Sequence, residues 1–139
     1  MAADGSALMN NNLLVIDVTC KDPVSVKGHM RDIVMIPFTG VAAGSDFVGK
    51  VIGEGVDTQK ISPDGKVFLS ARYMLEGKDA TGTPCRVFIE NQGSGETGFH
   101  PMIVTDSEYL SNWETMPLVA TIEGTESGVV VRIFKEDLS

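Results

Sequence analysis

Four polar side chains that lie within otherwise apolar sequence are the best candidates for chemistry in this chain: Asp57, Gln59, Arg72 and Asn91. An arginine can bind a carboxylate or enolate oxygen, and a nearby aspartate can act as a base or orient that group. Together these residue types suit proton transfer next to a carbonyl group, as in a cyclase or an isomerase. If Asp57 and Arg72 instead form a buried ion pair, they fix the strand register and do no chemistry.

The alternation of side chains along a β-strand decides which of these groups can meet. Asp57 and Gln59 are two residues apart and therefore share one face of a strand. In the run 67–76, Arg72 shares a face with large apolar groups, and we expect it inside, close to Asp57 on the neighbouring strand. Tyr73 lies on the opposite face, so it joins the same cavity only if a bulge interrupts the strand.

Two glycine-rich segments resemble phosphate-binding loops but lack the required context. Residues 44–50 have P-loop spacing, yet Val51 stands where a serine or threonine should contact magnesium. Residues 93–98 match G-x-G-x-x-G, but no helix pattern follows them, and we interpret them as a flexible loop between strands. His29 and His100 are isolated, so no metal site and no cofactor is predicted, and His100 is expected in solvent.

Short runs rich in Val, Ile, Phe and Thr, separated by turn residues, indicate a chain made mainly of β-strands. The predicted strands are 13–20, 32–38, 47–53, 58–62, 67–76, 83–91, 118–122 and 129–135. Ser62-Pro63-Asp64-Gly65 predicts a tight hairpin and 77–82 a second one. Thr105-Asp106-Ser107-Glu108 matches a capping box and predicts one short helix near residues 106–114. Without crossover helices, a sandwich or a closed barrel remains; a barrel of about eight strands is filled by side chains or holds one small ligand.

The stretch 47–93 resembles the domain of unknown function 3237, a family of short proteins of bacteria and fungi. The matching motifs are Asp57 with Gln59, Pro63-Asp64-Gly65, Ala71-Arg72-Tyr73 and Asn91-Gln92-Gly93. The resemblance implies a single antiparallel β-barrel of lipocalin-like type, and it supplies no activity. The residues that match its motif positions are Asp57, Gln59, Arg72, Tyr73 and Asn91. The chain departs from the family after Asn91, where family members usually have a longer segment.

Length, charge and cysteine content limit the remaining possibilities. The chain has 139 residues, which is enough for one domain; we expect a single barrel at 12–139 after a disordered tail at 1–11. Acidic residues outnumber basic ones 19 to 11, giving a net charge of −8, which disfavours nucleic acid and anionic membranes as partners. Cys20 and Cys85 are predicted to be buried, reduced thiols, and with no visible signal peptide we expect a cytoplasmic protein.

The sequence therefore predicts a small-molecule-binding β-barrel with Asp57 and Arg72 as candidate catalytic residues. Candidate ligand-binding residues are Gln59, Tyr73 and Asn91. Proton transfer next to a carbonyl is the reaction considered, but whether the protein is an enzyme at all stays open. The alternative is a non-catalytic barrel with a filled core that serves as a protein-interaction or oligomerisation module.

Overall fold

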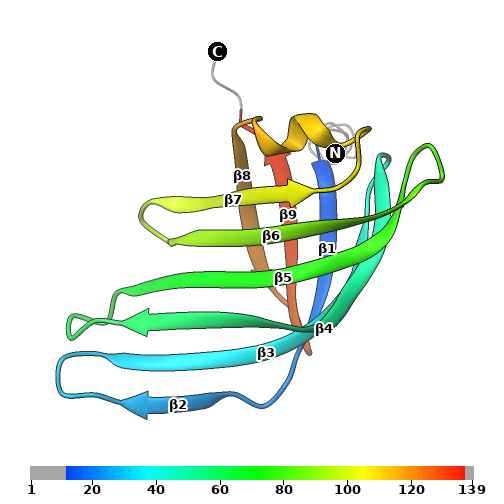
Figure 1. The fold of residues 1–139 in the computed structure, drawn as a ribbon. Coiled ribbons are helices and arrows are strands. Elements are labelled where there is room, and N and C mark those ends of the chain that lie inside the picture. The colour runs from blue at the N-terminus through cyan, green and yellow to red at the C-terminus, as the bar shows by residue number, and fades with distance from the viewer. Residues whose placement is uncertain (1–11, 137–139) are drawn as a thin grey trace, which may run out of the picture.

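The residues that the structure describes, 12–136, form nine β-strands and one short 3-10 helix in the computed structural model (Figure 1). The strands are β1 (Asn12–Cys20), β2 (Val24–Lys27), β3 (Asp32–Ala43), β4 (Phe47–Ile61), β5 (Val67–Asp79), β6 (Pro84–Ser94), β7 (Gly98–Thr105), β8 (Leu118–Gly124) and β9 (Gly128–Lys135). The 3-10 helix, η1, spans Ser111–Glu114. The tail predicted at 1–11 lies outside the described residues.

Antiparallel pairing joins these strands into a closed barrel. The order is β1-β9-β8-β7-β6-β5-β4-β3-β2, and a further pairing of β1 with β3 closes the sheet. Eight strands form the barrel, and β2 extends it as an outer edge strand that pairs only with β3. The β7–β8 junction is narrow, with Phe99 and Ala120 as its one pair of facing residues in the described chain. The predicted all-β fold, an antiparallel barrel of about eight strands, is confirmed.

The individual strands differ from the predicted set of eight, since the structure has nine, of which eight form the barrel. The predicted strands 47–53 and 58–62 are one strand, β4, whose register with β5 shifts between Ile52 and Val56. Gly53, with φ +62°, lets the chain bend there without ending the strand. The glycine segment 93–98 connects two strands, as predicted, but it is the tight turn between β6 and β7, and neither β7 nor β2 was predicted. The predicted helix is shorter than expected and is limited to η1.

Both predicted hairpins are present, and their turns have the expected chemistry. Gly65, at φ +86°, donates its N–H to the Ser62 carbonyl oxygen at 2.8 Å between β4 and β5. Between β5 and β6, Gly82 has φ +85° and donates to the Asp79 carbonyl oxygen at 2.9 Å. Positive φ angles at both positions explain why glycine is needed.

Apolar side chains fill one end of the barrel. Those that are largely or fully buried include Leu14, Ile16, Phe47, Leu75, Val87, Ile89, Ile103 and Ile133. Leu110 and, within η1, Trp113 belong to this core, and Figure 1 shows η1 lying beside the start of β8, the end of β9 and the start of β1. The buried Ser107 fixes the segment, because its hydroxyl donates to Asp79 Oδ2 at 2.7 Å and accepts from the Leu110 N–H at 3.1 Å. Within the described chain, no helix is long and apolar enough to cross a membrane.

Candidate functional site

The half of the barrel away from η1 encloses a cavity of about 140 Å³. Its wall is mostly apolar, and its apolar residues are Val18, Ile36, Phe38, Leu69, Ala71, Ile122, Val129 and Val131. Its remaining residues are Cys20, Asp57, Gln59, Tyr73 and Asn91. An apolar cavity with a few convergent polar groups is the usual form of a small-molecule site.

Strand register explains how the polar residues converge. Asp57 on β4, Ala71 on β5 and Asn91 on β6 face one another in one row across the sheet. The small side chain of Ala71 stands between the two polar residues, and this leaves space above the row. Gln59 follows Asp57 on the same face, as period-two geometry predicted. Tyr73 lies two residues beyond Ala71 on β5 and therefore also points inward.

Three polar atoms of the cavity wall have no hydrogen-bond partner within the described residues: Asp57 Oδ1, Tyr73 Oη and Asn91 Oδ1. Tyr73 is only 4% exposed and Asn91 only 2%. Gln59 Nε2 donates to the other carboxylate oxygen, Asp57 Oδ2, at 2.9 Å. Because buried polar groups are nearly always paired, three unpaired atoms around one cavity are a specific feature of this barrel.

Burial shifts the protonation of two of these groups. It raises the pKa of Asp57, and the hydrogen bond from Gln59 opposes this only in part. Burial also raises the pKa of Tyr73, so its hydroxyl stays neutral and remains a hydrogen-bond donor. Asp57 is thus easier to protonate than an ordinary aspartate, which is the property a carboxyl group needs to exchange a proton near neutral pH.

Arg72 does not belong to this site, and the expected pair with Asp57 is not formed. Its side chain is 62% exposed on the outer face, where Nε lies 3.8 Å from Glu90 Oε2. The face of β5 that points inward carries Leu69, Ala71, Tyr73 and Leu75, and turning Arg72 inward would expose all of them. Tyr73 and Arg72 lie on opposite faces of β5, as predicted, but Tyr73 is the one that points inward, and it does so without a bulge in β5.

The two cysteines occupy different surroundings. Cys85 is buried as predicted, whereas Cys20 is exposed and lines the cavity. Burial, and secondarily the charge of Asp57, raises the pKa of the Cys20 thiol. Sequence reasoning did not place Cys20 at the site, although it continues the inward face of Ile16 and Val18 at a spacing of two. His100 is exposed, as expected, with Nε2 3.2 Å from the Thr97 carbonyl oxygen.

The cavity residues are not arranged as a metal centre. Across residues 12–136, no three His, Cys, Asp or Glu side chains are grouped so that they could hold a metal ion. Besides the Cys20 thiol, the polar groups of the cavity are one carboxylate, two amides and one phenol, which bind organic molecules through hydrogen bonds.

Fold and site together define a closed eight-stranded antiparallel β-barrel with an internal cavity whose wall is mostly apolar and carries a few polar groups. The family described as "Protein of unknown function (DUF3237)" matches residues 11–103, and the chain belongs to this family. The matched region includes every polar residue of the cavity, so the predicted family membership is confirmed.

Individual proteins are similar to this chain in sequence or in fold. A UPF0311 protein of Clostridium acetobutylicum is 37% identical over 83 residues, which cover 56% of this chain and 49% of the relative. The match thus spans about half the length of that protein. A crystal structure of a protein with unknown function from Clostridium acetobutylicum is similar with a TM-score of 0.77 and 25% identity, covering 89% of this chain and 93% of the other. The structure of an enzyme from Penicillium herquei has a TM-score of 0.72 at 16% identity, covering 90% and 92% of the two chains, and shows the fold alone.

Proposed function

We propose that this protein binds a small, neutral, largely apolar carbonyl compound in the barrel cavity and transfers a proton on it. The observation that carries the proposal is the set of three unpartnered polar atoms, Asp57 Oδ1, Tyr73 Oη and Asn91 Oδ1, around one apolar cavity. Each would gain its missing hydrogen bond from a ligand that carries oxygen atoms, and the apolar wall would bury the rest of that ligand.

Each polar group has a role that follows from its chemistry. The Tyr73 hydroxyl donates a hydrogen bond to the carbonyl oxygen, and Asn91 Oδ1 accepts one from a hydroxyl of the ligand. Asp57 Oδ1 takes the proton from the carbon next to the carbonyl, and the electron pair of the broken C–H bond moves into an enolate. Asp57 then returns the proton to another atom, which completes an isomerisation or ring closure without any change of oxidation state. Gln59 holds Asp57 Oδ2 and so directs Oδ1 into the cavity.

The dimensions and charge of the cavity restrict the ligand. A protein cavity of about 150 Å³ holds a benzene-sized molecule, so 140 Å³ accommodates one six-membered ring. A larger ligand would have to extend past the exposed Cys20. Asp57 is the only charged side chain in the described wall, which disfavours an anionic ligand. Lipocalins also hold one small ligand inside an eight-stranded barrel, so the proposed binding mode is lipocalin-like.

The alternative function, a filled barrel that serves as an interaction or oligomerisation module, fits only part of the interior. The half beside η1 is filled, but the other half contains the cavity. One observation favours self-association: β2 is an edge strand whose Val24 and Val26 are exposed. Sedimentation of the protein would show whether this edge pairs, and a dimer is compatible with ligand binding in the cavity.

Cyclohexanone is a suitable first probe, because it is neutral, nearly the size of benzene and carries one carbonyl group. Binding is measured as protection of the Cys20 thiol, because we expect bound cyclohexanone to slow its alkylation by iodoacetamide. The reaction is run at alkaline pH, since the pKa of this thiol is raised and the thiolate is the reactive form. The Cys20→Ser variant leaves only the buried Cys85 and provides the baseline. Proton transfer is measured by NMR, as exchange of the ring's α-protons in deuterated water.

The outcomes separate the two parts of the proposal. We expect the wild-type protein to exchange the α-protons of cyclohexanone faster than buffer alone. Asp57→Asn should abolish this added exchange, and Arg72→Ala, whose side chain points outward, should leave it unchanged. Protection of Cys20 without exchange would reduce the protein to a carrier. If cyclohexanone neither protects Cys20 nor exchanges its protons faster than in buffer, the cavity is not a site for ligands of this class.

A further inference from the structure

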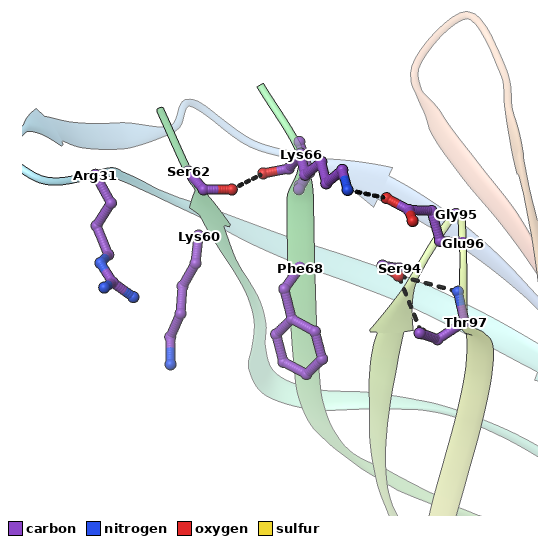
Figure 2. Close-up of a pocket in the computed structure, with 10 residues that line it drawn as sticks. Arg31, Lys60, Ser62, Lys66, Phe68, Ser94, Gly95, Glu96 and Thr97 are labelled. Carbon is purple, nitrogen blue, oxygen red and sulfur yellow. Dashed lines mark hydrogen bonds and ion pairs between the residues drawn. The ribbon is translucent and has the colours of Figure 1, made fainter. Parts of the chain in front are cut away.

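A second hollow lies on the outer surface of the barrel, away from the proposed cavity site. It is a groove of about 650 Å³ over the ends of β4, β5 and β6. The side chains that matter for recognition are Arg31, Lys60, Lys66 and Phe68 (Figure 2). Lys60 and Phe68 face each other across the β4–β5 pair on the outer face, whereas their neighbours Gln59 and Leu69 line the internal cavity. The groove and the cavity therefore lie on opposite faces of the same two strands.

The groove carries positive charge in a protein that is strongly acidic. Three of the 11 basic residues line it, although the net charge of the chain is −8. Lys66 is neutralised by Glu96 at 3.3 Å and lies 4.0 Å from Asp64. Arg31 and Lys60 form no ion pair with any of the described residues. The groove thus presents two unneutralised cations, which attract an anion.

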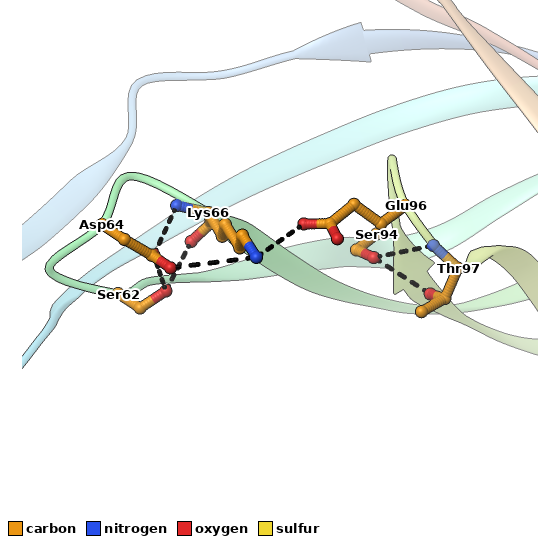
Figure 3. A network of polar contacts seen from close by, with 6 residues as sticks. All are labelled: Ser62, Asp64, Lys66, Ser94, Glu96 and Thr97. Atoms are coloured by element: carbon orange, nitrogen blue, oxygen red, sulfur yellow. Dashed lines mark hydrogen bonds and ion pairs between the residues drawn. The ribbon is translucent and has the colours of Figure 1, made fainter.

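Polar contacts hold the rim of the groove in place (Figure 3). In the β4–β5 turn, Asp64 Oδ1 accepts from the Ser62 hydroxyl at 2.9 Å and from the Lys66 N–H at 3.1 Å. In the β6–β7 turn, the Thr97 N–H donates to Ser94 Oγ at 3.1 Å. The Lys66–Glu96 ion pair joins these two turns. A rim that is already ordered loses little entropy when a ligand binds.

Phe68 gives the groove an apolar surface beside its cations. The residue is 42% exposed, so part of its ring is open to solvent at the groove. Figure 2 shows its ring beside the extended side chain of Lys60, with Arg31 on the far side of Lys60. An aromatic face next to two ammonium or guanidinium groups matches a flat molecule that carries a negative charge.

We propose that this groove binds a small aromatic anion, whose ring packs on Phe68 and whose carboxylate or sulfonate lies between Lys60 and Arg31. The proposal does not depend on the cavity site, because a different set of side chains on the opposite face of the sheet carries it. The ligand differs in kind as well: it is an anion, whereas the cavity contains a carboxylate and suits a neutral molecule.

The probe is 8-anilinonaphthalene-1-sulfonate, whose fluorescence rises on binding, and its neutral counterpart N-phenyl-1-naphthylamine lacks the sulfonate. The anionic dye is far too large for a cavity of about 140 Å³, so the groove is its expected site. We expect one dye per chain and weaker binding by about fivefold in Lys60→Gln or Arg31→Gln, the effect of one exposed charge pair. Phe68→Ser should weaken binding about tenfold. Added salt should weaken the anionic dye only.

Lys50→Gln is the matched control, because Lys50 is also exposed on β4 but lies opposite Glu76, away from the groove. It removes the same charge and should leave dye binding unchanged. Circular dichroism of each variant shows that the barrel is intact. Equal losses in Lys50→Gln and Lys60→Gln, or equal affinity for the charged and neutral dyes, would overturn the proposal. Loss of dye binding in Tyr73→Phe would also overturn it, since that residue belongs to the cavity.

Discussion

Replacing Tyr73 by phenylalanine should make the ligand-free protein more stable, which is opposite to the usual effect of deleting a buried hydroxyl. Tyrosine hydroxyls are normally paired when buried, and their removal then costs stability. The Tyr73 hydroxyl has no partner in the described residues, so folding removes it from water without giving it a hydrogen bond in exchange. The ring itself is retained in Tyr73→Phe, including its edge-on contact with Phe38 at a centroid distance of 5.3 Å.

The size of the effect follows from the cost of an unpaired polar group. Burying one without a hydrogen bond costs about 1–3 kcal/mol, and we take about 1.5 kcal/mol for a hydroxyl that borders a cavity. Unfolding entropy of about 2.1 cal/mol/K per residue gives about 0.3 kcal/mol/K for 139 residues. The melting temperature of Tyr73→Phe should therefore rise by about 5 °C.

Differential scanning calorimetry with urea denaturation at constant pH measures this change. Tyr109→Phe is the matched control, because the Tyr109 hydroxyl donates to Asp46 Oδ1 at 3.0 Å on the surface. Tyr109→Phe should therefore leave the melting temperature unchanged or lower it slightly, whereas Tyr73→Phe should raise it. A fall in the melting temperature of Tyr73→Phe would show that its hydroxyl is satisfied in the folded protein and would refute the reasoning behind the site. The same substitution should also weaken the protection of Cys20 by cyclohexanone.

Two further substitutions test the electrostatics of the cavity and the closure of the filled end. Burial raises the pKa of Asp57, so the charged carboxylate destabilises the folded protein at pH values above its folded-state pKa. We therefore expect Asp57→Asn to stabilise the protein by about 1 kcal/mol at pH 7. The gain is modest because solvent partly screens the carboxylate. This gain, followed by thermal melts, should vanish as the pH falls below the ordinary aspartate pKa, and a constant gain at all pH values would contradict the assignment. Ser107→Ala removes hydrogen bonds to Asp79 and Leu110 and should cost about 1–2 kcal/mol by urea denaturation. Hydrogen exchange should quicken at the Leu110 amide, and unchanged exchange there would show that Ser107 does not hold the segment.

The sequence predicts correctly which residues share a face of a strand, but it predicts the wrong face of β5 as the inner one. Asp57 and Gln59 share a face because alternation is a property of the extended backbone itself. In β5 both faces carry large apolar side chains, so hydrophobicity alone does not separate them. The decisive signal was charge: the inner face of β5 holds no charged side chain near the cavity, whereas the outer face holds Arg72. An exposed aliphatic or aromatic side chain costs little, but a buried unpaired guanidinium costs much more.

Two glycines at which the sequence predicts a strand to end instead bend a continuous strand or permit a close contact between two strands. Gly53 bends β4 but leaves it one strand, because a bulge absorbs the extra residues. Gly93 pairs with Phe99 across β6 and β7, and a Cβ there would overlap the Gly98 carbonyl oxygen. The G-x-G-x-x-G match thus marks a hairpin. Composition alone does not distinguish a glycine that ends a strand from one that lets two strands approach, since the difference depends on a partner strand.

The cavity itself depends on pairing between distant segments, which explains why its full wall was not predictable. Cys20 reaches the site because β1 pairs with β3, placing Cys20 opposite Phe38 and so within two strands of Asp57. No local pattern encodes this closure; it follows from the twist and stagger of the whole sheet. The same closure explains how the chain tolerates unpaired polar atoms. The packed half beside η1, with Trp113 and Leu110 at its end, supplies the burial that offsets the cost of these unpaired atoms.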